Sequence, residues 1–152
     1  MDRPFTFRLE RVRAIKERIE DQAKEELAGS LADRRKGEEA LRAAAVRVDQ
    51  ARSAHRDKLG GGAANPRELM ALQAYVERTE RARKAAELDL EQRRREVDAR
   101  RTALEAAARD RQVLERLKDR QRADHLLESA RLEGAAIDEM ALNIHRRAME
   151  TV

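Results

Sequence analysis

Several residue types are rare or missing in this chain of 152 residues. It has no cysteine and no tryptophan, and aromatic residues make up only 2%. Without cysteine the chain forms no disulfide and has no thiolate chemistry, which is typical of proteins in a reducing cytosol. No apolar run approaches the roughly 18 residues that a membrane span needs, and residues 1–7 lack the apolar stretch of a secretory signal. We therefore expect a cytoplasmic protein that reaches a membrane only through partners.

Proline and glycine are also scarce, and their positions divide the chain into two helices. The run Gly60-Gly61-Gly62 stands just before Asn65-Pro66. Glycine frees the backbone and ends a helix, whereas Asn as N-cap followed by Pro at the first helical position starts one. The 67 residues between Pro66 and Gly134 contain neither glycine nor proline, enough for a helix of roughly 100 Å. The sequence predicts one helix over about 6–59, a loop over 60–65 and a second helix over about 66–148.

The composition predicts a coiled coil in place of a globular core. Charged residues make up 42% of the chain and hydrophobic residues 41%, a balance typical of long helices that bury only a seam. Apolar residues recur at steps of three and four, and each such stripe needs a partner. In the first helix the predicted seam is Leu9, Val12, Ile15, Ile19, Ala23, Leu27, Leu31, Leu41, Ala45 and Val48; in the second it is Leu69, Leu72, Val76, Thr79, Arg83, Ala86, Leu90, Val97, Leu104 and Leu114.

Because the linker is short, the two helices are expected to pair with each other. We predict an all-α fold: one domain over residues 1–152, built as a long two-helix antiparallel coiled-coil hairpin with the second helix extending beyond the first. The extension carries apolar residues without an intramolecular cover: Leu126, Leu127, Leu132, Ile137, Met140, Ile144 and Met149. Exposed apolar helix of this kind is typical of a protein-binding surface.

The sequence shows no arrangement that points to catalysis. His55, His125 and His145 lack the His-x-x-x-His and Glu-x-x-His spacings of metal sites, and the glycine run lacks the Lys-Ser/Thr of a phosphate loop. The 34 basic and 30 acidic residues are interleaved, whereas a nucleic-acid binder gathers its basic residues on one stripe. We expect no enzyme, no catalytic residue, no cofactor, no metal and no nucleic-acid partner.

Two stretches resemble the family of the flagellar export protein FliJ. They are Phe5-Thr6-Phe7-Arg8-Leu9-Glu10 and Leu114-Glu115-Arg116-Leu117-Lys118-Asp119-Arg120-Gln121, with Ile137-Asp138-Glu139 further on. The family begins F-x-F-x-L-E and carries L-E-x-L-K-[DE]-R-Q and a later L-D-E. The resemblance implies a non-enzymatic component of the flagellar type III export apparatus, similar to the γ stalk of rotary ATPases. Such a protein binds the export ATPase, promotes its ring assembly and contacts the export gate protein FlhA; escort of export chaperones is also ascribed to the family.

Carried onto this sequence, the resemblance implies two binding surfaces. The gate-binding surface would comprise Val48, Ala51, His55, Tyr75, Thr79, Ala82 and Ala86, and the ATPase-binding surface would comprise Phe5, Phe7, Leu126, Ile137 and Met140. The expected location is cytoplasmic, peripherally associated with the inner membrane at the flagellar base. An alternative reading of the same features is a self-associating structural coiled coil that regulates no ATPase. The sequence leaves open whether the export system is flagellar or an injectisome.

Overall fold

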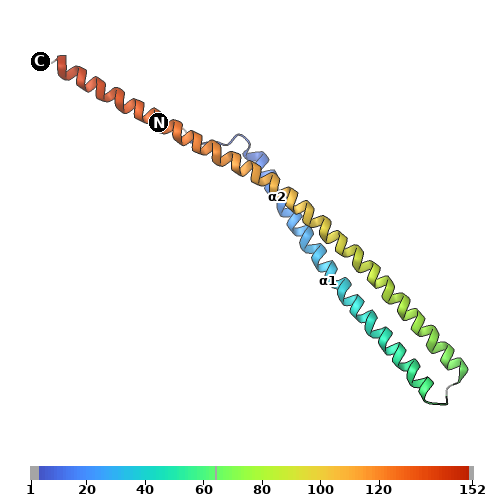
Figure 1. The fold of residues 1–152 in the computed structure, drawn as a ribbon. Coiled ribbons are helices and arrows are strands. Elements are labelled where there is room, and N and C mark those ends of the chain that lie inside the picture. Colours follow the sequence, from blue (N-terminus) through green and yellow to red (C-terminus); the bar gives the residue numbers. More distant parts are fainter. Residues whose placement is uncertain (1–3, 64, 151–152) are drawn as a thin grey trace. The chain divides into compact units, whose positions relative to one another are not determined.

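The computed structural model describes residues 4–63 and 65–150, which form an all-α helical hairpin, as the sequence predicted (Figure 1). Helix α1 runs over Glu10–Gly60 and helix α2 over Pro66–Glu150. The chain divides into two compact units: residues 1–20 with 107–152, here called the terminal unit, and residues 21–106, here called the loop unit. The prediction that residues 1–152 make one domain stays a prediction, and its two ends and Ala64 of the loop lie outside the described residues.

The turn between the helices follows the chemistry of its sequence. Helix α1 ends at Gly60, and Gly62 adopts a φ of 68°, a left-handed backbone that glycine accepts without strain. Asn65 then caps α2, because its side-chain oxygen accepts a hydrogen bond of 3.0 Å from the backbone N–H of Arg67. The predicted stop and start of the two helices at this turn are therefore confirmed.

Helix α1 begins at Glu10, later than the expected start near residue 6. The backbone N–H of Glu10 donates to the carbonyl of Phe7 at 3.1 Å, and the side chain of Phe7 is buried. Residues 4–7 have no regular structure. Burying an aromatic ring is worth more than one further turn at a fraying helix end, so these residues pack instead of continuing the helix.

In the loop unit, α1 presents a stripe of small residues to α2. Buried positions recur every seven residues along α1: Ala23, Ser30, Gly37, Ala44 and Ala51. Between them Val48 is fully buried, and on α2 Val97 is 1% exposed. The spacing keeps these side chains on one face, and their small size lets the two helices approach closely. All the predicted seam positions of α2 are buried or half-buried, which confirms the seam of that helix.

The predicted seam of α1 is confirmed from Ala23 to Val48 but is wrong nearer the N-terminus. The side chains of Leu9, Val12, Ile15 and Ile19 are 38% to 54% exposed. Charged residues one position further along the chain (Glu10, Arg13, Lys16 and Glu20) face α2 in their place. In the terminal unit, therefore, the contact between α1 and α2 is largely ionic, and an apolar face of α1 lies outward.

Candidate protein-interaction surfaces

Ion pairs join the first turns of α1 to α2 within the terminal unit. Lys118 donates from Nζ to Glu10 at 3.0 Å, and Arg13 donates to Glu115 at 2.9 Å. Two further pairs continue the series towards the loop: Lys16 with Asp110 at 3.2 Å and Arg111 with Glu20. Glu20 is 6% exposed, and the guanidinium of Arg111 offsets part of the cost of burying its carboxylate.

These contacts shift the pKa of three of the groups that make them: Glu10, Arg13 and Arg111. Hydrogen bonds from Arg13, and then from Lys118, lower the pKa of the Glu10 carboxyl to about 2. Hydrogen bonds to Glu10 and Glu115 raise the pKa of Arg13, and the hydrogen bond to Glu20 raises that of Arg111. A carboxylate that accepts hydrogen bonds from cations is stabilised in its charged form. The contacts between α1 and α2 in the terminal unit therefore stabilise the charged forms of Glu10, Arg13 and Arg111.

The residues before α1 lie against the same part of α2. The ring of Phe5 lies 5.8 Å from the ring of His125, tilted by 46°, and the guanidinium carbon of Arg122 is 5.7 Å from the Phe5 centroid. Phe7 is 8% exposed, while Phe5 is half-buried. Of these two predicted ATPase-binding residues, Phe7 therefore serves the packing of the unit, and Phe5 keeps part of its ring accessible.

The remaining predicted ATPase-binding residues lie on a part of α2 that no other described segment covers. Residues 126–150, here called the overhang, are helical, and all of them are exposed except the half-buried Ser129. Leu126, Ile137 and Met140 are 62% to 65% exposed. In Figure 1 this is the red end of α2, where no second helix runs beside it within the terminal unit. The extension of α2 beyond α1 that the sequence predicted is thus present.

The overhang exposes more apolar side chains than the predicted ATPase-binding set contains, and the sequence had already placed Leu132 and Ile144 among its uncovered residues. Ile144 is 69% exposed and Leu132 is 64% exposed. Taking 100° per residue, Leu126, Ile137, Met140 and Ile144 fall on one face of the helix, whereas Leu132 lies on another. These four residues are here called the overhang stripe. The helical period of the apolar residues is the sequence signal that identifies Ile144 as a member.

The predicted gate-binding residues, all in the loop unit, fall into two groups. Val48, Ala51 and Thr79 are buried between α1 and α2, and the Thr79 hydroxyl donates to the Val76 carbonyl at 2.8 Å. Tyr75 and Ala82 are exposed, whereas His55 and Ala86 are half-buried. The guanidinium carbon of Arg78 lies 5.9 Å from the centroid of the Tyr75 ring. The four accessible residues are the ones that a partner could touch directly.

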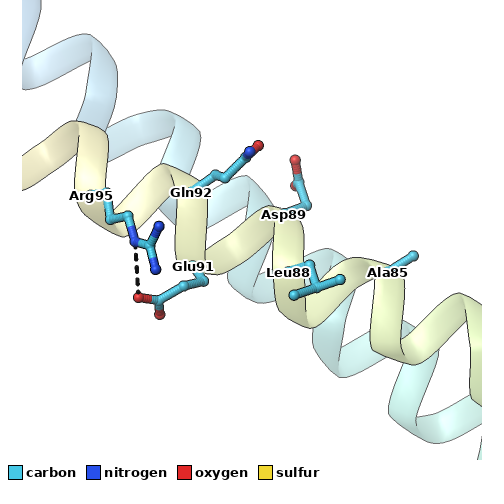
Figure 2. Close-up of a pocket in the computed structure, with 6 residues that line it drawn as sticks. All are labelled: Ala85, Leu88, Asp89, Glu91, Gln92 and Arg95. Carbon is cyan, nitrogen blue, oxygen red and sulfur yellow. Dashed lines mark ion pairs between the residues drawn. The ribbon is translucent and has the colours of Figure 1, made fainter.

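A shallow furrow on α2 in the loop unit carries no constellation of reactive groups. Figure 2 shows that its side chains all project from this one helix, with Glu91 and Arg95 forming an ion pair of 3.5 Å. It is lined by Ala85, Leu88, Asp89, Glu91, Gln92 and Arg95. A specific small-molecule site is usually concave and brings polar groups together from several directions, and this furrow does not.

The described residues offer no cluster of His, Cys, Asp and Glu that could hold a metal ion. Over the same residues, neither helix contains a segment that is both apolar and long enough to cross a bilayer. What α1 and α2 do present is exposed apolar helix beside charged seams, an arrangement suited to binding other proteins.

The chain belongs to the FliJ family. The family model described as flagellar FliJ protein matches residues 5–150, nearly the whole chain. It includes both motifs that carry the resemblance, around Phe5 and around Leu114. Membership makes the protein a component related to flagellar export, in a family that is non-enzymatic. Neither the curated proteins nor the solved structures contain a match.

Proposed function

We propose that this protein binds the ATPase of the flagellar export apparatus through the overhang and promotes assembly of the ATPase ring. The observation that carries the proposal is the overhang stripe: large apolar side chains, more than half exposed, on a part of α2 that no other described segment covers. Apolar side chains at this spacing fit a groove of a partner protein. The resemblance of the family to the γ stalk of rotary ATPases supports an ATPase as that partner.

A second contact, with the export gate protein FlhA, is proposed for the loop unit. The accessible residues Tyr75, Ala82, His55 and Ala86 would form it, with Tyr75 as the anchor because exposed aromatic residues are enriched among interface hot spots. Val48, Ala51 and Thr79 would support this surface from inside the seam. In this account the protein is cytoplasmic, associates with the inner membrane at the flagellar base only through its partners, and also contacts export chaperones.

The ATPase contact is tested by changing Leu126, Ile137 and Met140 together to serine. All three are exposed, so the hairpin keeps its fold while the apolar surface is lost. We expect binding of the cognate export ATPase to weaken at least about tenfold, since a few apolar anchors carry most of the affinity at an interface. The matched control changes Met70 and Leu88, which are 73% and 64% exposed in the loop unit, to serine. Equal binding by both variants would refute the proposed contact.

The gate contact is tested separately by Tyr75→Ala. We expect weaker binding to the isolated cytoplasmic part of FlhA and unchanged binding to the ATPase, because Tyr75 lies in the loop unit and not in the terminal unit. Leu88→Ala, on the same helix, is the control. Full binding of FlhA by Tyr75→Ala would remove the anchor from the proposal.

A further inference from the structure

The contact between α1 and α2 in the terminal unit has two edges, and ion pairs mark both of them. Arg13 pairs with Glu115 at one edge, and Lys16 pairs with Asp110 at the other. At 100° per residue, the two cations are about 60° apart around α1, and the two carboxylates are about 140° apart around α2. The pairs therefore fix the direction in which each helix turns towards each edge.

The apolar face of α1 lies at the edge that Lys16 marks. Around the helix from Lys16, the direction away from Arg13 leads outward at this edge. Val12 follows in that direction at about 40°, Ile19 at about 60° and Ile15 at about 100°. These three side chains are 41% to 54% exposed. Helix α1 therefore turns an open apolar row to this side of the unit.

Helix α2 adds a second apolar row at the same edge. Around the helix from Asp110, in the direction away from Glu115, Leu117 follows at about 20° and Val113 at about 60°. Leu117 is half-buried, and Val113 is 64% exposed. Both helices thus contribute apolar side chains to one side of the terminal unit.

The two rows together are here called the lateral face: Val12, Ile15 and Ile19 of α1 with Val113 and Leu117 of α2. In the antiparallel register that the pair of Arg13 with Glu115 sets, Ile15 lies level with Val113. Packed helices lie roughly 8–10 Å apart, so the rows run beside each other for about three turns. Two adjacent rows of this kind seat the apolar stripe of a third helix, as in helix bundles.

The border of the lateral face is basic. Helical angles place two arginines of each helix just beyond the apolar rows: Arg11, Arg18, Arg116 and Arg120. All four are exposed, and none of them forms an ion pair within residues 4–63 and 65–150. The carboxylates on the same side are Asp124 and Asp110, and Asp110 is already paired with Lys16. The border therefore has an excess of positive charge that the terminal unit itself does not neutralise.

We propose that the lateral face binds an amphipathic helix of another protein, one that carries carboxylates on both flanks of its apolar stripe. The apolar stripe would lie between the two rows, and the carboxylates would meet the bordering arginines. A helix fits better than a bilayer, because segments that lie on membranes use Trp, Tyr or Phe as interfacial anchors, and the lateral face has only Val, Ile and Leu. The overhang takes no part, so this proposal does not rest on the proposed function.

The test measures binding of a fluorescent synthetic helix to the full chain by anisotropy. The probe is about five turns long, with leucine at every third or fourth residue and glutamate on both flanks. A matched probe carries lysine in place of glutamate. We expect the wild type to bind the glutamate probe with a Kd on the order of 50 μM. The lysine probe should bind at least about tenfold more weakly, because it repels the arginines.

Two double variants separate the apolar contact from the charges. Ile15→Ser with Val113→Ser removes two exposed apolar side chains and should weaken binding of the glutamate probe at least about fivefold. Arg11→Glu with Arg18→Glu should lose most of the preference for glutamate over lysine. The control is the variant with serine at positions 126, 137 and 140, which should bind the glutamate probe like the wild type. Circular dichroism checks that each variant keeps its helix content.

A wild type that does not bind the glutamate probe, or that binds both probes equally, would overturn the proposal. Unchanged binding by the variant with serine at positions 15 and 113 would place the probe elsewhere and overturn it as well. Vesicles of phosphatidylglycerol and phosphatidylcholine are a second probe: binding to them without binding to the glutamate helix would assign the face to a membrane. In analytical ultracentrifugation, a wild-type dimer that the same serine variant cannot form would assign the face to a second copy. Either result would contradict the proposed helix.

Discussion

Truncating an apolar side chain of α1 should cost more stability in the loop unit than in the terminal unit, even where the residue in the terminal unit is the larger one. Val48 is fully buried in the loop unit, whereas Ile19 in the terminal unit is 45% exposed. Val48→Ala removes two buried carbons, worth about 0.8 kcal/mol each, and leaves a small cavity, so we expect a loss of about 2 kcal/mol. Ile19→Ala removes more carbon, but about half of that surface is already in water and no closed cavity forms. Its expected cost is about 1 kcal/mol.

The assay is urea denaturation followed by circular dichroism, with thermal melting as a second measurement. A loss of about 2 kcal/mol corresponds to a fall in melting temperature of about 4–8 °C for a chain of this size. Met70→Ala, at a position 73% exposed, is the control and should change stability by less than about 0.5 kcal/mol. If Ile19→Ala cost more than Val48→Ala, α1 would have to present its apolar face to α2 in the terminal unit. The ionic seam would then be refuted.

Further substitutions test three local features: an ion-paired carboxylate, two helical glycines and a helix cap. The Glu10 carboxyl, with a folded pKa of about 2 against an ordinary 4.5, stabilises the terminal unit above pH 4.5, and this contribution is lost as the pH falls through about 2. Between pH 5 and 2 the wild type should therefore lose more thermal stability than Glu10→Gln; equal losses would contradict the assignment. Gly29→Ala should stabilise by about 1 kcal/mol in urea, since a Cβ there meets open space. Gly37→Ala should gain less, because its Cβ would lie 2.8 Å from Arg93 Cδ, and an equal gain would contradict the close packing. Asn65→Ala should cost about 1 kcal/mol and Asn65→Asp little, as judged by melting temperature, because the cap accepts a hydrogen bond at the start of α2.

The sequence predicted the helices well where a single residue type decides the structure. Glycine and proline mark the turn at Gly60–Pro66 because their backbone limits act locally. The seam of α2 was also predictable, since its residues hold one seven-residue register from Leu69 to Leu114. The start of α1 was less predictable from the sequence. It depends on the burial of Phe7, a tertiary contact that local propensity does not contain.

The error in the seam of α1 has a physical cause. Counting large apolar residues selected Ile15 and Ile19, but the structure places Lys16 and Glu20 against α2. Long charged side chains can cover a helix with their stems and still pair at their ends, so they compete with aliphatic residues for a seam. The stripe of small residues at every seventh position of α1 in the loop unit was not predicted, for a related reason. Ser30 and Gly37 are not hydrophobic residue types, yet both are buried.

The sequence could not predict which of the proposed binding residues are accessible to a partner. The resemblance named Val48 and Tyr75 alike for the gate surface, but one is fully buried and the other is 44% exposed. In contrast, the exposure of Leu126, Ile137 and Met140 followed from the unequal lengths of the two helices. An unequal hairpin leaves the longer helix uncovered wherever its partner ends.

The most direct test of the account is steady-state ATP hydrolysis by the cognate export ATPase, titrated with this protein while light scattering follows ring formation. The account predicts that hydrolysis and scattering rise together, and that the variant with serine at positions 126, 137 and 140 raises neither. The control variant with serine at positions 70 and 88 should behave like the wild type. Hydrolysis and assembly that stay unchanged at saturating protein would contradict the central claim that this chain acts on the export ATPase.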